Sequence, residues 1–232
     1  MRKSAAKKRA VAASSVTQSA QSLTDKAYGQ LEEMIVTLRL APGRAVSESE
    51  LSRHLGIGRT PIREALQRLA REHLVTILPR RGIIVSAVNP SNQLRLLEVR
   101  RELERLIARS AARRCSDAER GRFRELAKLF ETSARTDDEV TFMRVDREFN
   151  ELCSLTAHNE FAASTMLLLH SLSRRFWFIH YRQVADMPLA GRLHAGMARA
   201  IAAGNEAAAA AASDKLLDYI EEFTRATVSA ER

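Results

Sequence analysis

Three polar side chains between positions 59 and 67 have a spacing suited to reading DNA bases. Arg59, Arg63 and Gln67 recur every four residues, which places them on one face of a helix. The major groove of DNA admits a helix, and an arginine can donate two parallel hydrogen bonds to O6 and N7 of guanine. The sequence therefore predicts a helix whose basic and amide face contacts the bases of a duplex.

The residues around this face predict the helix-turn-helix that would position it. Ser47 and Glu50 form a capping box at the start of a short helix, and Gly56 favours the left-handed conformation that ends it. Thr60 is expected to cap the second helix, with Pro61 at its first position, where a missing amide hydrogen costs nothing. Apolar residues at helical spacing supply a shared core: Leu51, Leu55, Ile57, Ile62, Leu66 and Leu69.

Two β-prone runs after the second helix predict a wing. Residues 75–78 and 83–85 are rich in Val and Ile, as strands of a hairpin are. The tip between the two strands carries Arg80, Arg81 and Gly82 and is therefore cationic.

A further helix is expected over residues 23–40, ended by Pro42 and Gly43. Its apolar stripe would pack beneath the helix-turn-helix: Leu31, Met34, Ile35 and Leu38. Together these elements predict a winged helix-turn-helix over residues 23–88. The alternative is a small helical domain whose basic face is only solvated.

Positive charge is concentrated in the segment that carries these motifs. The 232-residue chain has a formal net charge of +9, and residues 1–88 hold 15 Lys and Arg against 7 Asp and Glu. Residues 89–232 hold 22 against 21 and are nearly neutral. Because a protein that binds a duplex must neutralise phosphates, this distribution favours DNA binding by the N-terminal part alone.

Residues 1–22 contain basic residues but no Asp or Glu, and their composition predicts a disordered basic arm. Three interpretations stay open: an arm that adds phosphate contacts, a tail without a role, or a transit peptide.

The cysteine content and the hydropathy pattern indicate the cellular compartment. Cys115 and Cys153 are the only cysteines and form no CxxC pair, so neither a disulfide framework nor a thiolate metal site is expected. No apolar run approaches the roughly 18 residues that span a bilayer. We expect a cytoplasmic protein without membrane contact.

After a composition break at residues 87–91, helical periodicity continues to the end of the chain. Six helices are expected: about 91–114, 117–134, 137–156, 160–182, 188–203 and 205–229. The predicted fold class is therefore mainly α, with a winged helix-turn-helix followed by an all-helical bundle over residues 89–232. Such a bundle can enclose a pocket between its helices.

These residues resemble a known family. The run from Leu51 to Leu69, with Gly-Arg-Thr-Pro-Ile-Arg-Glu-Ala-Leu at 58–66, resembles the GntR family of bacterial transcription regulators. The helical remainder resembles the FCD effector domain of its FadR-type branch, on looser cues in residues 98–104, 146–150 and 193–201.

The resemblance implies a homodimer on a pseudo-palindromic operator of double-stranded DNA. The recognition helices would enter successive major grooves, and the wing tips the minor groove between them. Arg59, Thr60 and Arg63 would contact bases and phosphates, with Arg81 and Gly82 at the wing tip. FadR itself has arginine at the position of Ser49, so we expect a different or looser operator.

The resemblance also implies a ligand pocket and a question about metal. FCD domains usually hold a divalent ion such as Zn or Ni through an Asp, a His four residues later and two further His. Here Asp146 and His194 match two of these positions, but the other two fall on Asn150, a weak ligand, and Leu216, which cannot ligate. We favour a pocket without metal, in which Asp146 and His194 form an ion pair or hydrogen bond.

Without metal, other polar groups would have to bind the effector. The family resemblance suggests that this effector is a small organic acid. Arg100 matches a pocket-facing position and can bind a carboxylate in bidentate fashion; its alternative is a surface ion pair with Glu104. With Asp146, Asn150 and His194 it completes the candidate effector-binding set.

The segment 171–182 is rich in aromatic residues and has two interpretations. It could line the pocket or a dimer surface, but such runs more often form ordinary core with their charged residues solvated. His170 and His180 are likewise expected to be hydrogen-bonded core histidines.

Three functions follow in order of preference. The first is a sequence-specific, ligand-responsive DNA-binding regulator without catalytic residues. The second is a structural nucleic-acid-binding protein without effector response. The third is a metal-dependent enzyme in the bundle, disfavoured because the sequence lacks a Glu-x-x-His pair, a Gly-x-Ser-x-Gly motif and a phosphate-binding glycine loop.

Overall fold

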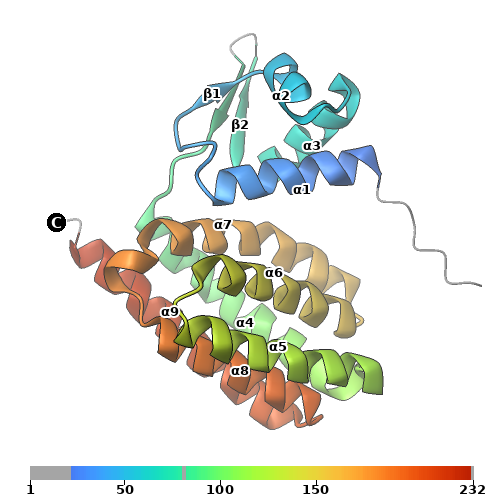
Figure 1. Cartoon of the computed structure of the whole chain (residues 1–232), viewed down its shortest axis with the longest axis vertical. Helices are drawn as coiled ribbons and strands as arrows, with labels where there is room; N and C mark the ends of the chain where they lie inside the picture. The colour runs from blue at the N-terminus through green and yellow to red at the C-terminus, as the bar shows by residue number, and fades with distance from the viewer. Residues whose placement is uncertain (1–21, 80–81, 231–232) are drawn as a thin grey trace, which may run out of the picture.

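The computed structural model describes residues 22–79 and 82–230, which form two units joined by a short extended segment (Figure 1). The upper unit in Figure 1 contains three helices and three short strands, and the lower unit is a bundle of six helices. The predicted class, a mainly α chain with a winged helix-turn-helix followed by an all-helical bundle, is confirmed for these residues.

Three helices and a small sheet build the N-terminal unit. Its elements are α1 Leu23–Val36, β1 Ala45–Val46, α2 Glu48–Leu55, α3 Arg59–Arg71, β2 Val75–Leu78 and β3 Gly82–Val85. The sheet has the order β1-β3-β2 with antiparallel pairing, and Val75 lies opposite Val85. Strand β1 was not expected from the sequence, because two residues are too few to show a period.

The first helix is shorter than its sequence pattern indicated. α1 ends at Val36 with Thr37 as its C-cap, and Leu38 takes a left-handed conformation with φ of 60°. Leu38 is therefore only half-buried, and Leu40, beyond the turn, reaches the core in its place. Helical spacing could not identify this residue because the chain leaves the helix before it.

Two capping assignments in the helix-turn-helix need correction. Ser47 Oγ accepts from Glu50 N at 3.2 Å, but the Glu50 carboxylate bonds Arg44 at 2.9 Å and does not complete a capping box. α3 begins at Arg59 with Gly58 as N-cap, so Thr60 lies inside the first turn and caps nothing. Gly56, with φ of 64°, ends α2 in the left-handed conformation as expected.

The bundle follows the predicted helix boundaries to within two residues. It comprises α4 Pro90–Arg114, α5 Asp117–Arg135, α6 Glu139–Thr156, α7 Glu160–Val184, α8 Met187–Ala202 and α9 Glu206–Ala230. Polar N-caps set most of these starts; Ser116 and Glu119, for example, form a complete capping box at α5. Within the described residues, no helix is both long and apolar enough to cross a bilayer.

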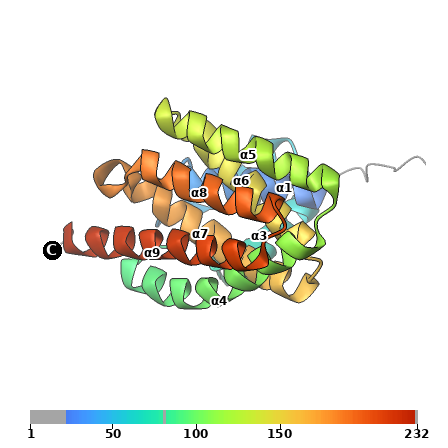
Figure 2. The ribbon, with the colours of Figure 1, turned by 90° about the horizontal axis from the view of Figure 1, so that it is seen from below.

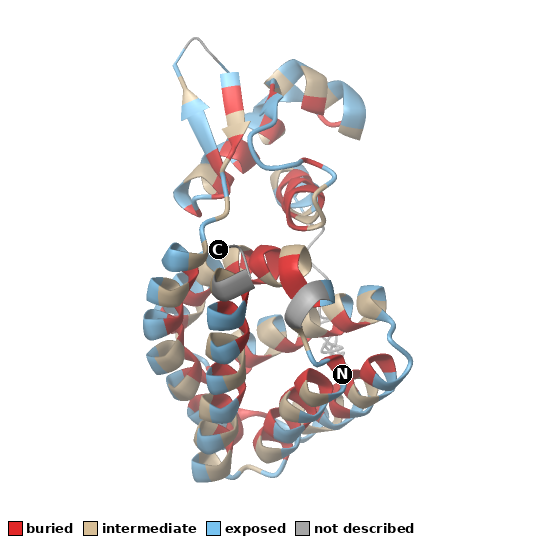
Figure 3. Cartoon of the chain, turned by 90° about the vertical axis from the view of Figure 1, so that its left-hand side faces the viewer, coloured by how far each residue is buried: buried red, intermediate tan, exposed pale blue. Residues whose placement is uncertain are grey.

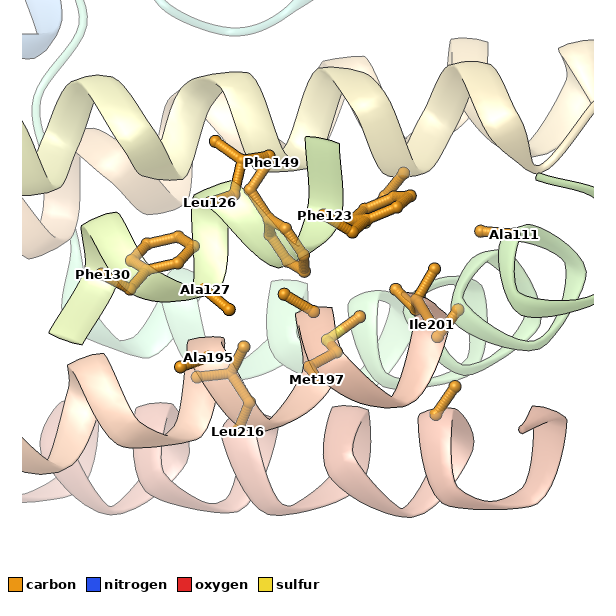
Figure 4. Packing of buried hydrophobic residues seen from close by; sticks show 14 of the residues in the cluster. Ala111, Phe123, Leu126, Ala127, Phe130, Phe149, Ala195, Met197, Ile201 and Leu216 are labelled. Atoms are coloured by element: carbon orange, nitrogen blue, oxygen red, sulfur yellow. The ribbon is translucent and has the colours of Figure 1, made fainter. Parts of the chain in front are cut away.

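Two pairs of helices in the bundle pack closely along their lengths. α4 lies along α9 and α5 along α8 (Figure 2), and their apolar faces turn inward, away from the exposed outer faces (Figure 3). Phe123 and Phe130 pack edge-on against Phe149 at centroid distances of 5.9 and 5.6 Å (Figure 4). This aromatic cluster fixes α5 against α6.

The two units meet where α1 lies against α7, the bundle helix nearest the winged unit (Figure 1). Leu172 of α7 packs against the hydrophobic core of the winged unit. Polar contacts across this boundary join α1 to α6 and α7, and they are central to the site described below.

Close packing of α5 and α8 predicts opposite effects for two glycines of α8. A Cβ on Gly191 would lie 2.4 Å from the Ala134 Cβ, whereas a Cβ on Gly196 would meet nothing within 4 Å. We expect Gly191→Ala to lower the free energy of unfolding by about 1–3 kcal/mol through overpacking. Gly196→Ala should raise it by about 1 kcal/mol through helix propensity. Urea unfolding measures both, and equal effects of the two substitutions would contradict this account of the packing.

Candidate functional site

The predicted DNA-reading residues share one exposed face of α3. Arg59, Thr60, Arg63 and Gln67 are exposed, whereas Ile62 on the opposite side is fully buried. The apolar stripe anchors the helix in the unit, so the polar face is presented to solvent at a fixed orientation.

Arg63 is oriented by a neighbour on the preceding helix. Its Nε and Nη2 each donate to the Glu48 carboxylate at 2.8 Å, while the arginine side chain stays 56% exposed. The hydrogen bond and positive charge of Arg63 lower the pKa of Glu48. This ion pair holds the guanidinium above the α3 surface, where an approaching acceptor can compete with the carboxylate.

Of the predicted wing-tip residues, Gly82 is described, and Arg80 and Arg81 lie outside the described residues, as does the expected arm apart from Ser22. Gly82 is exposed and has φ of 96°, a conformation that side chains rarely adopt. A Cβ there would also lie 3.4 Å from the Val46 carbonyl oxygen of β1. Glycine at this position is therefore a requirement of the hairpin.

The four predicted effector-binding residues come together around one buried cavity. Arg100 of α4, Asp146 and Asn150 of α6 and His194 of α8 all line a cavity of about 50 Å³ inside the bundle. Leu216 of α9, the fourth position implied by the family resemblance, lines it too. Aromatic side chains form much of the remaining wall: Phe142, Phe149, Phe176, Trp177, Tyr219 and Phe223.

Asp146 is the centre of a polar cluster in this cavity. Its carboxylate lies 3.3 Å from His194 Nε2 and accepts from Asn150 Nδ2 at 3.2 Å. The Arg174 Nε lies 3.7 Å from Oδ2 on the other side. Burial disfavours the charged carboxylate, but the hydrogen bond with His194 and the charges of His194 and Arg174 outweigh it, so the pKa of Asp146 is lowered.

His194 is held in place by its own surroundings. Its Nδ1 lies 2.8 Å from the Ala190 carbonyl oxygen, one turn earlier, and its ring stacks on Phe130 at a centroid distance of 4.6 Å. The expected contact between Asp146 and His194 is therefore present, and the imidazole has little freedom to turn away from the carboxylate.

Arg100 forms the expected ion pair with Glu104, but not at the surface. Its Nε donates to Glu104 Oε1 at 2.6 Å, and each residue is only 6% exposed. The interpretation as a surface pair is wrong, because this face of α4 turns toward the cavity. Burial is the largest influence on the pKa of Glu104 and raises it, but Arg100 and the nearby His170 together outweigh burial, so the pKa is lowered.

The segment 171–182 contributes to the cavity as well as to the core. Ser173, Arg174, Phe176 and Trp177 line the cavity, as does His170 just before them. The expectation that the charged residues would be solvated is wrong: Arg174 is 8% exposed and Arg175 only 1%. Helical spacing alone could not show this, because the winged unit covers the α7 face that carries them.

Arg174 connects the cavity to the winged unit, a contact that the sequence did not predict. Its Nη1 donates to Glu32 Oε1 of α1 at 2.9 Å, while its Nε faces Asp146. Glu32 is only 3% exposed and is also 3.4 Å from Arg147 of α6. The one available signal was a pair of acids, Glu32 and Glu33, beside the buried stripe of α1.

The residues of the cavity do not fit the divalent metal that the family resemblance implies. Asn150 turns its amide nitrogen to Asp146, and Leu216 offers no donor atom. In the described part of the chain, no three His, Cys, Asp or Glu side chains are placed to hold a metal ion. The Arg174 guanidinium supplies a positive charge beside Asp146 instead.

A helix-turn-helix with an exposed basic face, a wing and a helical bundle around a polar cavity define the class of DNA-binding regulatory proteins. Residues 23–85 match the model of the bacterial regulatory proteins of the gntR family, and residues 95–219 match that of the FCD domain. The chain belongs to the GntR family and carries an FCD domain.

Individual relatives agree with this assignment. An HTH-type transcriptional regulator in an unstable DNA locus of Streptomyces ambofaciens is 50% identical over 64 residues, 28% of this chain and 27% of that protein. This chain thus aligns with about a quarter of that relative. The HTH-type transcriptional repressor RspR of Escherichia coli K12 is 24% identical over 88% of this chain and 90% of its own length.

A solved structure shows the same fold. Escherichia coli McbR/YncC superposes with a TM-score of 0.77 and 18% identity, covering 89% of this chain and 99% of that one. Families and relatives together agree on the GntR family of regulators with an FCD domain.

The buried Arg100–Glu104 pair generates a stability prediction. Glu104→Gln leaves a buried guanidinium without its counter-charge, and we expect it to lower the free energy of unfolding by about 3–5 kcal/mol. The double substitution Arg100→Met with Glu104→Leu removes both charges and should stay much closer to wild type. Urea unfolding compares the two variants. A double variant as unstable as the single one would show that the charge imbalance is not the cause.

Proposed function

We propose that the chain is a dimeric regulator that binds a pseudo-palindromic operator and whose DNA affinity is controlled by a small organic acid in the bundle cavity. The proposal assigns operator binding to residues 23–88, and effector binding and dimerisation to residues 89–232. No metal and no catalytic step are part of it.

In the DNA-binding unit, Arg59, Thr60, Arg63 and Gln67 are proposed to contact bases and phosphates. Their common exposed face on α3 and the buried stripe behind it support this role. Arg80, Arg81 and Gly82 are proposed to contact the backbone from the wing. On specific DNA, Arg63 would then exchange its ion pair with Glu48 for hydrogen bonds to guanine. On other sequences the ion pair would stay intact.

In the effector cavity, Arg100, Asp146, Asn150 and His194 are proposed to surround the ligand, with Arg174 as its positive partner. Arg174 Nε has no hydrogen-bond partner among the described residues, although its surroundings are buried. Such a donor is suited to a carboxylate oxygen. The aromatic wall would contact the apolar part of a compact acid.

The observation that carries the regulatory proposal is the position of Arg174 between the cavity and α1. The same guanidinium lies 3.7 Å from the Asp146 carboxylate and 2.9 Å from that of Glu32. An acid that binds Arg174 in the cavity would compete with Glu32 for it. The contact that fixes the DNA-reading unit against α7 would thereby weaken, and ligand and DNA affinities would be coupled.

For the DNA-contacting face, we expect Arg63→Ala to weaken binding to operator DNA by about 1–3 kcal/mol and to reduce discrimination at one base position. Fluorescence anisotropy with a selected genomic site measures this. Arg113→Ala is the matched control, since it removes the same charge from an exposed position on α4 of the bundle. Equal losses of DNA affinity in both variants would show that Arg63 acts only through the net charge of the protein, and would refute base contact.

For the coupling, a panel of small carboxylic acids is tested by thermal unfolding and by operator binding. We expect Arg174→Met to abolish stabilisation by the acid that stabilises wild type. Glu32→Gln should keep that stabilisation but reduce the acid-dependent change in operator affinity from at least fivefold to less than twofold. Glu33→Gln, whose half-exposed carboxylate lies 4.0 Å from Arg174 Nη2, is the control and should behave as wild type. An unchanged response in Glu32→Gln would refute the link.

A further inference from the structure

A second buried arginine, next to Arg174 on α7, has no carboxylate partner among the described residues. Arg175 is 1% exposed, and its Nη2 donates to the Ser86 carbonyl oxygen after β3. Its Nε and Nη1 have no hydrogen-bond partner among the described residues. Burial alone lowers the pKa of this guanidinium, to about 10, so it stays charged at neutral pH.

An uncompensated buried cation is costly, and a single carbonyl bond does not neutralise it. Folded proteins normally pair such groups or use them to bind something. Arg174, one residue earlier, has Glu32 and Asp146 beside it, so α7 is not short of acidic neighbours in general. The missing counter-charge at Arg175 therefore needs its own explanation.

Arg175 lines a second cavity, which is adjacent to the effector cavity and shares Gln93 and Phe176 with it. This second cavity has a volume of about 330 Å³ and lies between the winged unit and the bundle. His73, from the turn after α3, forms one side, and Leu172 and Phe176 of α7 form the other. The segment that joins the two units lines it as well, through Ala87 and Val88.

The polar lining of this cavity is suited to an anion. Asn89 and Asn92, at the start of α4, contribute exposed amides, and His73 is a further nitrogen donor at an exposed position. Gln93 also lines the cavity, but its amide nitrogen already donates to Ser173 Oγ at 2.9 Å. None of the described lining residues is Asp or Glu. The N-terminal end of α4 adds the positive end of a helix dipole to the same space.

We propose that this cavity binds the oxyanion of a small molecule, a carboxylate or phosphate group, with Arg175 as its counter-charge. The ligand would receive hydrogen bonds from Arg175 Nε and Nη1 and would contact groups from both units. This site differs from the effector cavity in its charged residue, Arg175 instead of Arg174, and in its effect: a ligand here would hold the winged unit against α7 rather than release it.

The test measures thermal unfolding of the full-length protein in chloride, inorganic phosphate and acetate at constant ionic strength. We expect phosphate, acetate or both to raise the Tm of wild type by a few degrees above chloride, because a ligand specific to the folded state stabilises it. The anion that raises the Tm, phosphate or acetate, identifies the kind of oxyanion that binds. Arg175→Met should shift the concentration for half-maximal stabilisation at least tenfold upward.

Two further variants make the result specific. Arg182→Met, an exposed position on the same helix, should respond as wild type does and controls for loss of charge. Arg174→Met should keep the phosphate response, because Arg174 does not line this cavity, whereas an acetate response lost in that variant would belong to the effector cavity. A response lost in Arg174→Met but kept in Arg175→Met would overturn this proposal and leave the proposed effector site standing.

The stability of Arg175→Met in chloride gives an independent check. Removing a buried charge that lacks a partner should leave the Tm unchanged or raise it, so the variant is expected to fold. Hydrogen exchange then locates the ligand: phosphate or acetate should slow the amides of residues 86–93 in wild type and not in Arg175→Met. No anion response in wild type, or an equal response in both proteins, would overturn the proposal.

Discussion

Buried positive charge on α7 is the constraint on which the arrangement of the two units depends. Arg174 and Arg175 lie under the winged unit, where neither side chain can reach water freely. A buried guanidinium needs partners. Arg174 therefore pairs with Glu32 of α1 and lies close to Asp146 of α6, and Arg175 donates a hydrogen bond to the Ser86 carbonyl oxygen. Apolar packing brings the units together, but these bonds fix which faces meet.

The same constraint explains how the cavity differs from the metal-bearing pattern that the family resemblance implied. A metal ion would serve as the positive centre for Asp146 and for an incoming acid. Here Asn150 and Leu216 stand at two of the four positions, and Arg174 provides the cation. An arginine also reaches across the boundary between the units, which a metal ion held within the bundle does not.

Much of the fold was predictable because local signals agreed with one another. N-caps, glycine stops and apolar periodicity located the bundle helices, and the motif at 58–66 located the exposed face of α3. Local signals failed where another nearby interaction or conformation replaced the expected one: Glu50 bonds Arg44 instead of completing a capping box, and the chain leaves α1 before Leu38. The cavity residues that were identified, such as Asp146 and His194, came from the family resemblance, since their spacing in the sequence carries no such information.

The sequence by itself determined the elements, the basic face of α3 and the family, because these depend on neighbours within a few turns of helix. Only the tertiary structure decided how deeply each charged side chain is buried and which partner it has. Arg100 and Glu104 are one turn apart and resemble a surface pair until α6, α7 and α9 enclose them. Arg174 and Glu32 are 142 residues apart, and no periodicity relates them. Burial and partnership of charge depend on which faces pack together, and that is a property of the folded chain as a whole.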